Sequence, residues 1–252
     1  MDEQELCKKK LIDLSRRANR KEIVLFSDFL NLNELNIFHQ SEKFFETRTE
    51  SFGGVPHAER QMIAFISDAL YLRGDVEYPI TALKITPAYP KFAEKLGHRD
   101  ILGSIMQLGV DRGKLGDIIL DEDAYYVLCE KSIAPYFIEN LDKIRHTLVK
   151  LEEVSAAQLL GKQELEEKQG IVTSNRLDAV VACVHKLSRS QALDLLRSEK
   201  VFVNGKTTQN PSYVCRESDI VSVRGYGRFI FQSAYGETNK GRLKIKYLVY
   251  GN

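Results

Sequence analysis

Apolar residues in the first 74 positions recur at the spacing of helices. Leu6, Leu11 and Leu14 stand between polar neighbours, the run "LNELNIFHQSEKFF" repeats the spacing, and residues 58–72 continue it after "GGVP". Apolar positions that return every three or four residues give a helix one face to bury. The pattern therefore predicts a helical N-terminal segment over residues 1–74, with no strand in it.

The pattern changes near residue 78, where strand-like and helix-like stretches begin to alternate. "YPITALKIT", "LGDIILD", "AYYVLCE" and "TLVKLEEV" have the composition of strands, whereas "DILGSIMQLG", which ends at Gly109, and "IAPYFIENLDKI" have helical spacing. The resulting order, β-α-β-β-α-β, is that of a ferredoxin-like or RRM-like domain, which we expect over residues 75–160. The polar run "SAAQLLGKQELEEKQG" that follows predicts a linker or a short solvated helix.

Residues 171–252 predict two short helices. The apolar stripe of the first helix consists of Leu177, Val180, Val181 and Val184. Asn175 and Asp178 have the spacing of a capping box at the start of that helix. Ser188 and Gln191 have the same spacing at the start of the second helix.

A small β-sheet is expected after the two helices. The Asn-Gly pair in "VFVNGKT" predicts a tight hairpin turn, because both central residues of such a turn take positive φ. "PSYVCRESDIVSVRGYGRFIF" and "GRLKIKYLVY" continue as alternating strands. In the second run, Leu243, Ile245 and Tyr247 would face the core while Lys244 and Lys246 face solvent. The chain as a whole is thus expected to have an α+β fold.

Charge is distributed unevenly along the chain. The formal net charge of the 252 residues is only +1, yet residues 171–252 contain 13 Lys and Arg against 6 Asp and Glu, and residues 1–170 contain 23 against 29. A basic part beside an acidic remainder indicates a polyanionic partner for the basic part alone.

Several other classes of protein do not fit the sequence. No stretch approaches the roughly 18 uninterrupted apolar residues of a membrane span. The start, "MDEQELCKKKLIDLSRR", is charged throughout, unlike a secretion signal, so we expect a cytoplasmic protein. The cysteines are far apart and form no C-x-x-C pair, which argues against a zinc site and a disulfide framework. We expect no metal and no small-molecule cofactor. The cysteines are Cys7, Cys129, Cys183 and Cys215.

The starts of the two C-terminal helices carry the residue types of a phosphate site. A helix N-terminus offers unpaired backbone N–H groups and the positive end of the helix dipole. Ser188 and Ser190 add hydroxyl groups, and Arg176, Lys186 and Arg189 add positive charge. On spacing alone, the same serines fit equally well as helix caps and the same arginines as solvated side chains.

The runs "RLDAVV", "LSRSQALDLLRSEKVFVNGK", "PSYV", "SDIVSV" and "RGYGRF" occur in this order over residues 176–229. In this order they resemble the S4 RNA-binding domain. The resemblance implies an RNA-binding surface formed by the N-terminal ends of the two helices and the adjoining loop. Lys186, between the two helices, is added for its charge. The expected RNA-binding residues are Arg176, Lys186, Ser188, Arg189, Ser190, Gln191, Lys206, Arg224 and Arg228.

Motifs ahead of this domain extend the resemblance. "GGVPHAER", "LKITP", "HRDILGSIMQLGVDRGKLGDI" and "AYYVLCEKSIAPYF" make the chain similar to the YlmH family of bacterial S4-domain proteins over essentially its full length. The resemblance implies association with ribosomes and action on stalled large subunits in translation quality control. The expected partners are structured RNA, either rRNA or tRNA, and the large ribosomal subunit, with no membrane partner.

Catalysis finds little support in the sequence. "HRD" at 98–100 lacks the asparagine and the other motifs of a protein kinase. S4 domains also occur in pseudouridine synthases, tyrosyl-tRNA synthetases and rRNA methyltransferases, but their motifs are absent, and "NRLD" places Asp178 at a helix start inside the S4 domain. We therefore predict a non-catalytic RNA-binding protein.

Two alternatives remain open. One is an rRNA- or tRNA-modifying enzyme, of the pseudouridine synthase or methyltransferase type, with an unrecognised site in the middle domain. The other is a protein-interaction module whose S4 domain has lost RNA affinity.

Tyr125 and Tyr126 in the third strand of the middle domain fit core packing better than RNA stacking, because the first RNP motif is missing around them.

Overall fold

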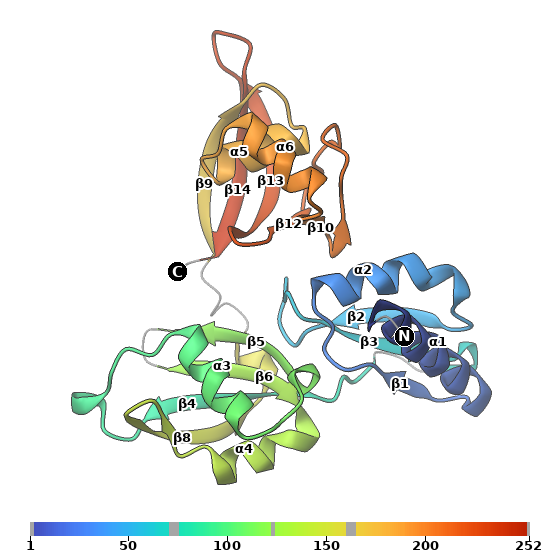
Figure 1. Ribbon diagram of the computed structural model, residues 1–252, viewed down its shortest axis with the longest axis vertical. Helices are drawn as coiled ribbons and strands as arrows, with labels where there is room; N and C mark the ends of the chain where they lie inside the picture. The colour runs from blue at the N-terminus through green and yellow to red at the C-terminus, as the bar shows by residue number, and fades with distance from the viewer. Residues whose placement is uncertain (1–2, 71–75, 122–123, 160–164, 251–252) are drawn as a thin grey trace. The chain divides into compact units, whose positions relative to one another are not determined.

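The computed structural model describes residues 3–70, 76–121, 124–159 and 165–250. The chain divides into two compact units, an N-terminal unit of residues 1–163 and a C-terminal unit of residues 164–252. The described residues contain six α-helices and three antiparallel sheets (Figure 1), so the α+β fold expected from the sequence is confirmed. No helix in these ranges is long and apolar enough to cross a membrane.

The first part of the N-terminal unit combines two helices with a small sheet. Its elements are α1 (Glu3–Lys21), β1 (Val24–Phe26), α2 (Leu32–Ser41), β2 (Arg48–Phe52) and β3 (Met62–Ile66). The strand order is β1-β3-β2. Leu11 of α1 and Phe38 of α2 are buried with Ile63 and Phe65 of β3, so both helices contribute to one core with the central strand.

The prediction of a purely helical N-terminal segment is wrong. Residues 62–66, "MIAFI", form the central strand β3, and all five are buried. A short continuous apolar run fits a strand buried on both faces as well as a buried helix, and periodicity alone does not separate them. The predicted helix over 58–72 also extends into residues 71–75, which lie outside the described residues.

The second part of the N-terminal unit is a sheet with two helices on one face (Figure 1). Its elements are β4 (Ile80–Pro87), α3 (His98–Gln107), β5 (Leu115–Leu120), β6 (Tyr125–Glu130), α4 (Ala134–Asn140), β7 (Lys143–Ile144) and β8 (Thr147–Val154). The strand order is β5-β6-β4-β8-β7. The four strands and two helices predicted here are confirmed, and Gly109 follows α3 with φ 76°, as a residue that ends a helix often does.

Backbone and side-chain hydrogen bonds connect the two parts of the N-terminal unit. The Arg60 guanidinium donates to the carbonyl oxygens of Phe29 (2.6 Å) and Leu115 (2.8 Å). The Asp117 carboxylate accepts from the backbone amides of Glu59 (2.7 Å) and Arg60 (3.0 Å). The bonds to Leu115 and Asp117 connect the β2–β3 loop with strand β5, far away in the sequence.

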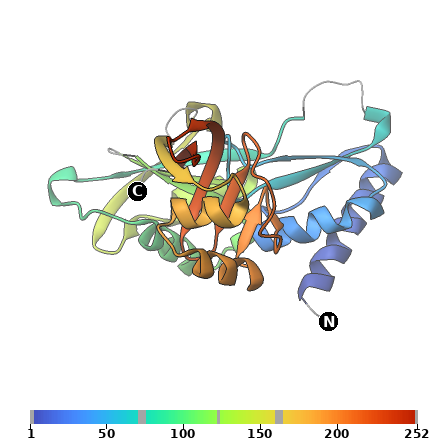
Figure 2. The same ribbon diagram turned by 90° about the horizontal axis from the view of Figure 1, so that it is seen from above.

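The C-terminal unit contains a six-stranded sheet with two helices on one face (Figures 1 and 2). Its elements are β9 (Leu165–Val172), α5 (Leu177–Val184), α6 (Arg189–Arg197), β10 (Val201–Val203), β11 (Lys206–Thr207), β12 (Ile220–Val223), β13 (Gly227–Glu237) and β14 (Leu243–Tyr250). The strand order is β11-β10-β12-β13-β14-β9.

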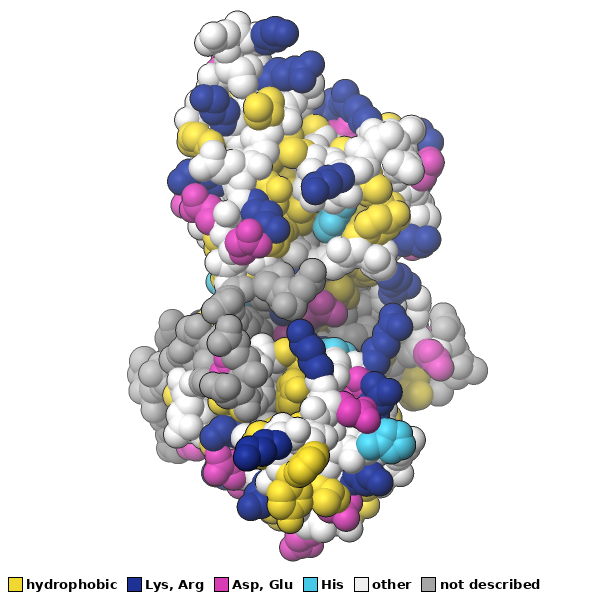
Figure 3. All heavy atoms as spheres, turned by 90° about the vertical axis from the view of Figure 1, so that its left-hand side faces the viewer, with side chains coloured by type: hydrophobic (Ala, Val, Ile, Leu, Met, Phe, Trp, Pro, Cys, Tyr) yellow, Lys and Arg dark blue, Asp and Glu magenta, His cyan; other side chains and the backbone are white. Residues whose placement is uncertain are grey.

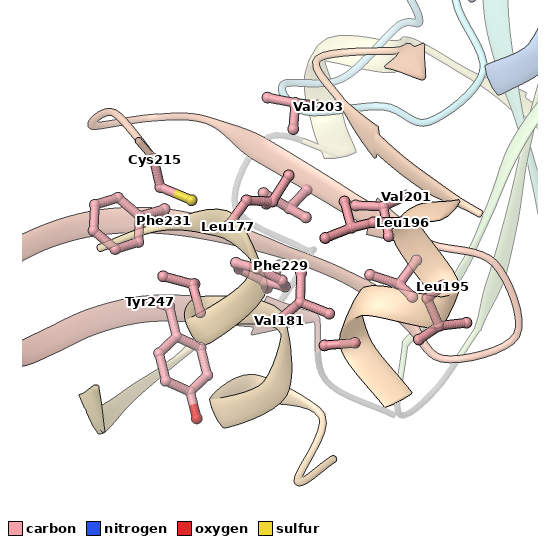
Figure 4. Close-up of a cluster of buried hydrophobic side chains, with 14 of the residues drawn as sticks. Leu177, Val181, Leu195, Leu196, Val201, Val203, Cys215, Phe229, Phe231 and Tyr247 are labelled. Carbon is pink, nitrogen blue, oxygen red and sulfur yellow. The ribbon is translucent and has the colours of Figure 1, made fainter. Parts of the chain in front are cut away.

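Figure 4 shows how the two helices attach to this sheet. Leu177 and Val181 of α5 lie beside Phe229 of β13, and Leu196 of α6 lies beside Val201 of β10. All five belong to one buried cluster. Val180 is buried with them, as the predicted stripe required, and Val184 is partly buried against the same core. This packing fixes the two helices, and therefore their N-terminal ends, relative to each other.

The prediction of a linker or solvated helix after the middle sheet is wrong for its second half. Residues 165–172 form strand β9, which pairs along its whole length with β14. Lys246 of β14 lies 3.0 Å from Glu167 of β9, so an ion pair joins the two strands. Residues 160–164 of the predicted linker lie outside the described residues. The C-terminal unit therefore begins earlier than the resemblance to an S4 domain indicates.

The hairpin turn predicted at the Asn-Gly pair is confirmed. Asn204 has φ 51° and Gly205 has φ 78°, the two positive values that such a turn requires. In strand β14, Ile245 and Tyr247 are buried and Lys244 is exposed, as predicted, while Leu243 and Lys246 are half-buried. The local turn and the alternation were therefore readable from the sequence.

Candidate nucleic-acid interface

The start of α5 does not have the predicted cap. Its N-cap residue is Arg176, and no side chain accepts a hydrogen bond there, so the prediction that Asn175 and Asp178 form a capping box is wrong. The amide of Leu177 donates to the carbonyl of Tyr213 (2.8 Å), and that of Asp178 to the carbonyl of Pro211 (3.4 Å). A neighbouring loop therefore satisfies the first amides of α5, and they are not available to a phosphate.

Asp178 instead connects the starts of the two helices. Its carboxylate, 1% exposed, accepts from Arg176 Nε at 3.2 Å and from Arg189 Nε at 3.0 Å, and Arg189 Nη2 lies 2.9 Å from it. The two arginine side chains are 37% and 55% exposed. One buried carboxylate thus holds two guanidinium groups at the surface, and the three charges sum to +1.

This arrangement keeps hydrogen-bond donors available. Each guanidinium has five N–H donors, and Arg176 and Arg189 each direct two of their nitrogens at Asp178. An arginine fixed by a carboxylate also loses less conformational entropy when it binds a phosphate. We refer to Asp178, Arg176 and Arg189 as the arginine clamp.

The start of α6 forms the predicted capping box. Ser188 Oγ accepts from the amide of Gln191 (3.2 Å), and Gln191 Oε1 accepts from the amide of Ser188 (2.9 Å). Ser190 Oγ lies 3.0 Å from Ser188 Oγ. Within the described residues, the amides of Arg189 and Ser190 have no acceptor, so this helix end retains donors for an anion.

The other predicted RNA-binding residues lie on turns and strands of the same unit. Lys186 is exposed between the two helices with φ 54°. Lys206 follows the Asn-Gly turn and is exposed. Arg224 is exposed, with its guanidinium carbon 5.9 Å from the centre of the Phe202 ring, whereas Arg228 is half-buried. Figure 3 shows Lys and Arg side chains spread over one face of this unit around exposed hydrophobic side chains.

An exposed aromatic ring lies between Arg224 and Arg228 in the sequence. Tyr226 is in the β12–β13 turn, flanked by Gly225 and Gly227, both with positive φ. Its ring centre is 5.8 Å from that of His185, at the end of α5. Burial lowers the pKa of His185, and its Nε2 has no hydrogen-bond partner in the described part of the chain. Tyr226 was not among the predicted RNA-binding residues, although the "RGYGRF" motif contains it.

Asp219 holds in place the loop whose carbonyl groups accept hydrogen bonds from the first amides of α5. Its buried carboxylate accepts from Tyr213 OH (2.8 Å), Asn204 Nδ2 (2.9 Å) and the amide of Arg216 (2.8 Å). Burial and the hydrogen bond to Asp219 raise the pKa of Tyr213 to about 12. Because the carbonyl of Tyr213 accepts from the first amide of α5, Asp219 couples the Asn-Gly hairpin to the start of the helix. Spacing in the sequence gave no sign of this link.

No chemistry of metal binding or thiol catalysis emerges from the described residues. They contain no group of three His, Cys, Asp or Glu side chains placed to hold a metal ion. Burial raises the pKa of Cys129 and of Cys215 to about 12, so both thiols are protonated at neutral pH and unreactive. In the middle sheet, Tyr126 is buried and Tyr125 accepts from the amide of Leu96 (3.2 Å), so both side chains serve packing.

Two protein-family models match the chain. The model described as "Putative RNA-binding domain in YlmH" matches residues 74–158, and the model of the S4 domain matches residues 175–221. The first match covers the middle sheet with its helices. The second contains the arginine clamp, the α6 cap and the Asn-Gly hairpin.

Known proteins resemble the chain over most of its length. "Ribosome-associated protein quality control protein P2" of Bacillus subtilis (strain 168) is 30% identical over 196 residues, which are 77% of this chain and 75% of that protein. The solved structure of "Cell division protein ylmH from Streptococcus pneumoniae" aligns with a TM-score of 0.51 and 22% identity, over 64% of this chain and 96% of that one. At that identity, the likeness to the solved structure concerns the fold alone.

Proposed function

The chain belongs to the YlmH family, and from that premise we propose that it binds structured RNA through the starts of α5 and α6. The observation that carries the proposal is the arginine clamp, in which a buried carboxylate holds Arg176 and Arg189 at the surface. Pre-positioned guanidinium groups suit phosphate oxygens, because they offer paired donors in a fixed plane.

The other predicted residues add hydrogen-bond donors and positive charge to those of the arginine clamp. The α6 cap presents two amides and the Ser190 hydroxyl, while Lys186 and Lys206 add exposed ammonium groups. Arg224 and Arg228 flank Tyr226, whose exposed ring is suited to stacking on an unpaired base. The proposed interface therefore combines phosphate contacts with one aromatic contact.

For the rest of the chain, we propose a ferredoxin-like middle domain over residues 75–160, between a domain of residues 1–74 and an S4 domain within residues 171–252. The strand order β5-β6-β4-β8 and the two helices on one face support the ferredoxin-like assignment. We propose a non-catalytic role for all three, since the matched models are a putative RNA-binding domain and the S4 domain.

The family supports a proposal about the partner of this chain. The Bacillus subtilis relative is named as ribosome-associated and as a quality-control protein. We propose that this chain also associates with ribosomes in the cytoplasm, through rRNA or tRNA on the large subunit, and acts on stalled translation. The excess of positive charge in residues 171–252 suits such a polyanionic surface.

Co-sedimentation with isolated ribosomal subunits tests this function. The purified chain should pellet with large subunits, and Arg189→Ala should lower the affinity about 10-fold, because it removes one charge-assisted contact. Arg197→Ala is the matched control, since Arg197 lies at the opposite end of α6 and is exposed. Pelleting with small subunits alone would contradict the assigned subunit, and no binding to either subunit or to tRNA would contradict the function.

A further inference from the structure

The loop between β4 and α3 exposes two aromatic side chains. Phe92 is 85% exposed and Tyr89 is 64% exposed, the highest values among the large hydrophobic side chains that the structure describes. Burying such a ring is typically worth about 1.5–3 kcal/mol, so a folded chain gains nothing by holding two of them in water. Single exposed apolar residues are ordinary, but two within one short turn indicate a contact surface.

This loop is held in place by its neighbours. Pro90–Phe92 form a 3-10 turn, in which the amide of Phe92 donates to the carbonyl of Tyr89 (3.1 Å). The amide of Ala88 donates to the carbonyl of Leu148 (2.8 Å), and that of Glu94 to the hydroxyl of Thr147 (3.1 Å). Because both ends of the loop are bonded to the first two residues of β8, the rings are presented on a supported backbone.

The loop with the two rings and the segment bonded to it both carry net positive charge. The loop, residues 88–97, and the segment that it contacts, residues 142–150, together contain five Lys and Arg against two Asp and Glu, although residues 1–170 as a whole are acidic. The basic residues are Lys91, Lys95, Lys143, Arg145 and Lys150. All five are exposed, and of the five only Arg145 forms an ion pair within the described ranges, with Glu94 and Asp100.

Figure 3 views the molecule from the side on which this loop projects in Figure 1. On that face of the N-terminal unit, exposed hydrophobic side chains gather with Lys and Arg side chains beside them. Leu148, in the segment that supports the loop, is exposed as well. The rings and the basic side chains therefore lie on two exposed segments that hydrogen bonds hold together.

The chemistry of this surface favours nucleic acid over protein. Lysine is depleted in the centres of protein interfaces, whereas exposed rings next to lysines are the usual means of binding single-stranded nucleic acid. Each base offers a π-face to a ring, and each phosphate offers a charge to an ammonium group. A duplex keeps its bases stacked inside, so the rings select an unpaired segment.

We propose that the β4–α3 loop is a second RNA-binding site, in which Tyr89 and Phe92 stack on unpaired bases and Lys91 and Lys95 contact the adjoining phosphates. The site lies in the N-terminal unit and involves none of the residues of the arginine clamp. The loop lies within residues 74–158, which match the model described as a putative RNA-binding domain. The proposal goes beyond that match and beyond the proposed function, because it names the residues of a site in this unit and the unpaired RNA that they select.

The test uses the full chain and a short oligouridine that carries 4-thiouridine. Irradiation should crosslink the RNA to the peptide that contains residues 89–92, as located by mass spectrometry. Tyr89→Ala with Phe92→Ala should weaken binding of the oligouridine about 10-fold, in the range expected when base-stacking rings are removed. Tyr136→Ala, which removes an exposed ring from α4, should leave binding unchanged.

Single substitutions at Phe92 separate stacking from simple hydrophobic contact. Phe92→Trp should retain affinity, and Phe92→Leu should lose it, because leucine keeps the apolar bulk without a π-face. Equal affinity of Phe92→Leu and the wild type, or of the double variant and the wild type, would overturn the proposal. The first of these results would show that binding of the oligouridine needs no aromatic ring at residue 92.

The two RNA proposals fail separately in this experiment. Arg189→Ala should weaken binding of structured RNA and leave the crosslink at residues 89–92 intact. Loss of that crosslink in Arg189→Ala would assign oligouridine binding to the C-terminal unit and overturn the second site. An intact crosslink in a chain that does not bind ribosomal subunits would instead refute the proposed ribosomal function alone.

Discussion

At the scale of single residues, Asp178 shows what the sequence could and could not reveal. The motif "NRLD" predicted that Asp178 lies at a helix start and is not a catalytic aspartate. Its burial, and its contact with Arg189 eleven positions later, depend on how α5 packs against α6. A pattern of spacings holds no information on that packing, so the capping box assigned to Asp178 was wrong and its role between two arginines was not foreseen.

Asp178→Asn is expected to weaken RNA binding even though it makes the chain more positive. The amide keeps the size of the side chain but no longer fixes both guanidinium groups, and the lost ion pairs should cost about 1–2 kcal/mol of unfolding free energy, discounted because both arginines are partly exposed. Urea denaturation and an RNA titration measure the two effects.

Asp194→Asn is the control for this prediction. Asp194 is an exposed residue on α6, and its substitution changes the net charge by the same amount without touching the clamp. If net charge alone governed binding, both variants would bind RNA more tightly. Tighter binding by Asp178→Asn would therefore show that the clamp has no positioning role.

At the scale of elements, local signals were reliable and distant pairings were not. The α6 capping box involves residues three positions apart, and the Asn-Gly turn involves neighbours, so both were readable. Strand β9 pairs with β14, more than seventy positions away, and its acidic sequence resembles a solvated segment until that partner is known. Strand β3 was missed for a related reason, since burial on both faces removes the alternation that identifies a strand.

Ser188→Ala is expected to lower the stability of the C-terminal unit by about 1 kcal/mol, the usual cost of a lost N-cap. Ser190→Ala should cost less, because Ser190 Oγ contacts only the Ser188 hydroxyl in the described structure. Urea denaturation of both variants measures the difference. Equal losses would show that the capping box does not stabilise α6.

At the scale of the whole molecule, the uneven charge along the sequence was the property of composition that said most about function. The contrast between the basic residues 171–252 and the acidic residues 1–170 points to a polyanionic partner for one part, and the S4-like motifs were needed to identify that partner as RNA. Composition averaged over residues 1–170 also conceals the basic surface around Tyr89 and Phe92. That surface becomes visible only when the β4–α3 loop and the start of β8, about fifty residues apart, are seen in contact.

The salt dependence of RNA affinity tests the central claim most directly. For the wild-type chain and ribosomal RNA, the logarithm of the binding constant should fall linearly with the logarithm of salt concentration, and each neutralised phosphate should add about 0.7–0.9 to the steepness. The double variant Arg176→Ala, Arg189→Ala should therefore be shallower by about 1.4–1.8, while Arg197→Ala keeps the wild-type slope. An unchanged slope in the double variant would contradict the assignment of the arginine clamp as the phosphate-binding site.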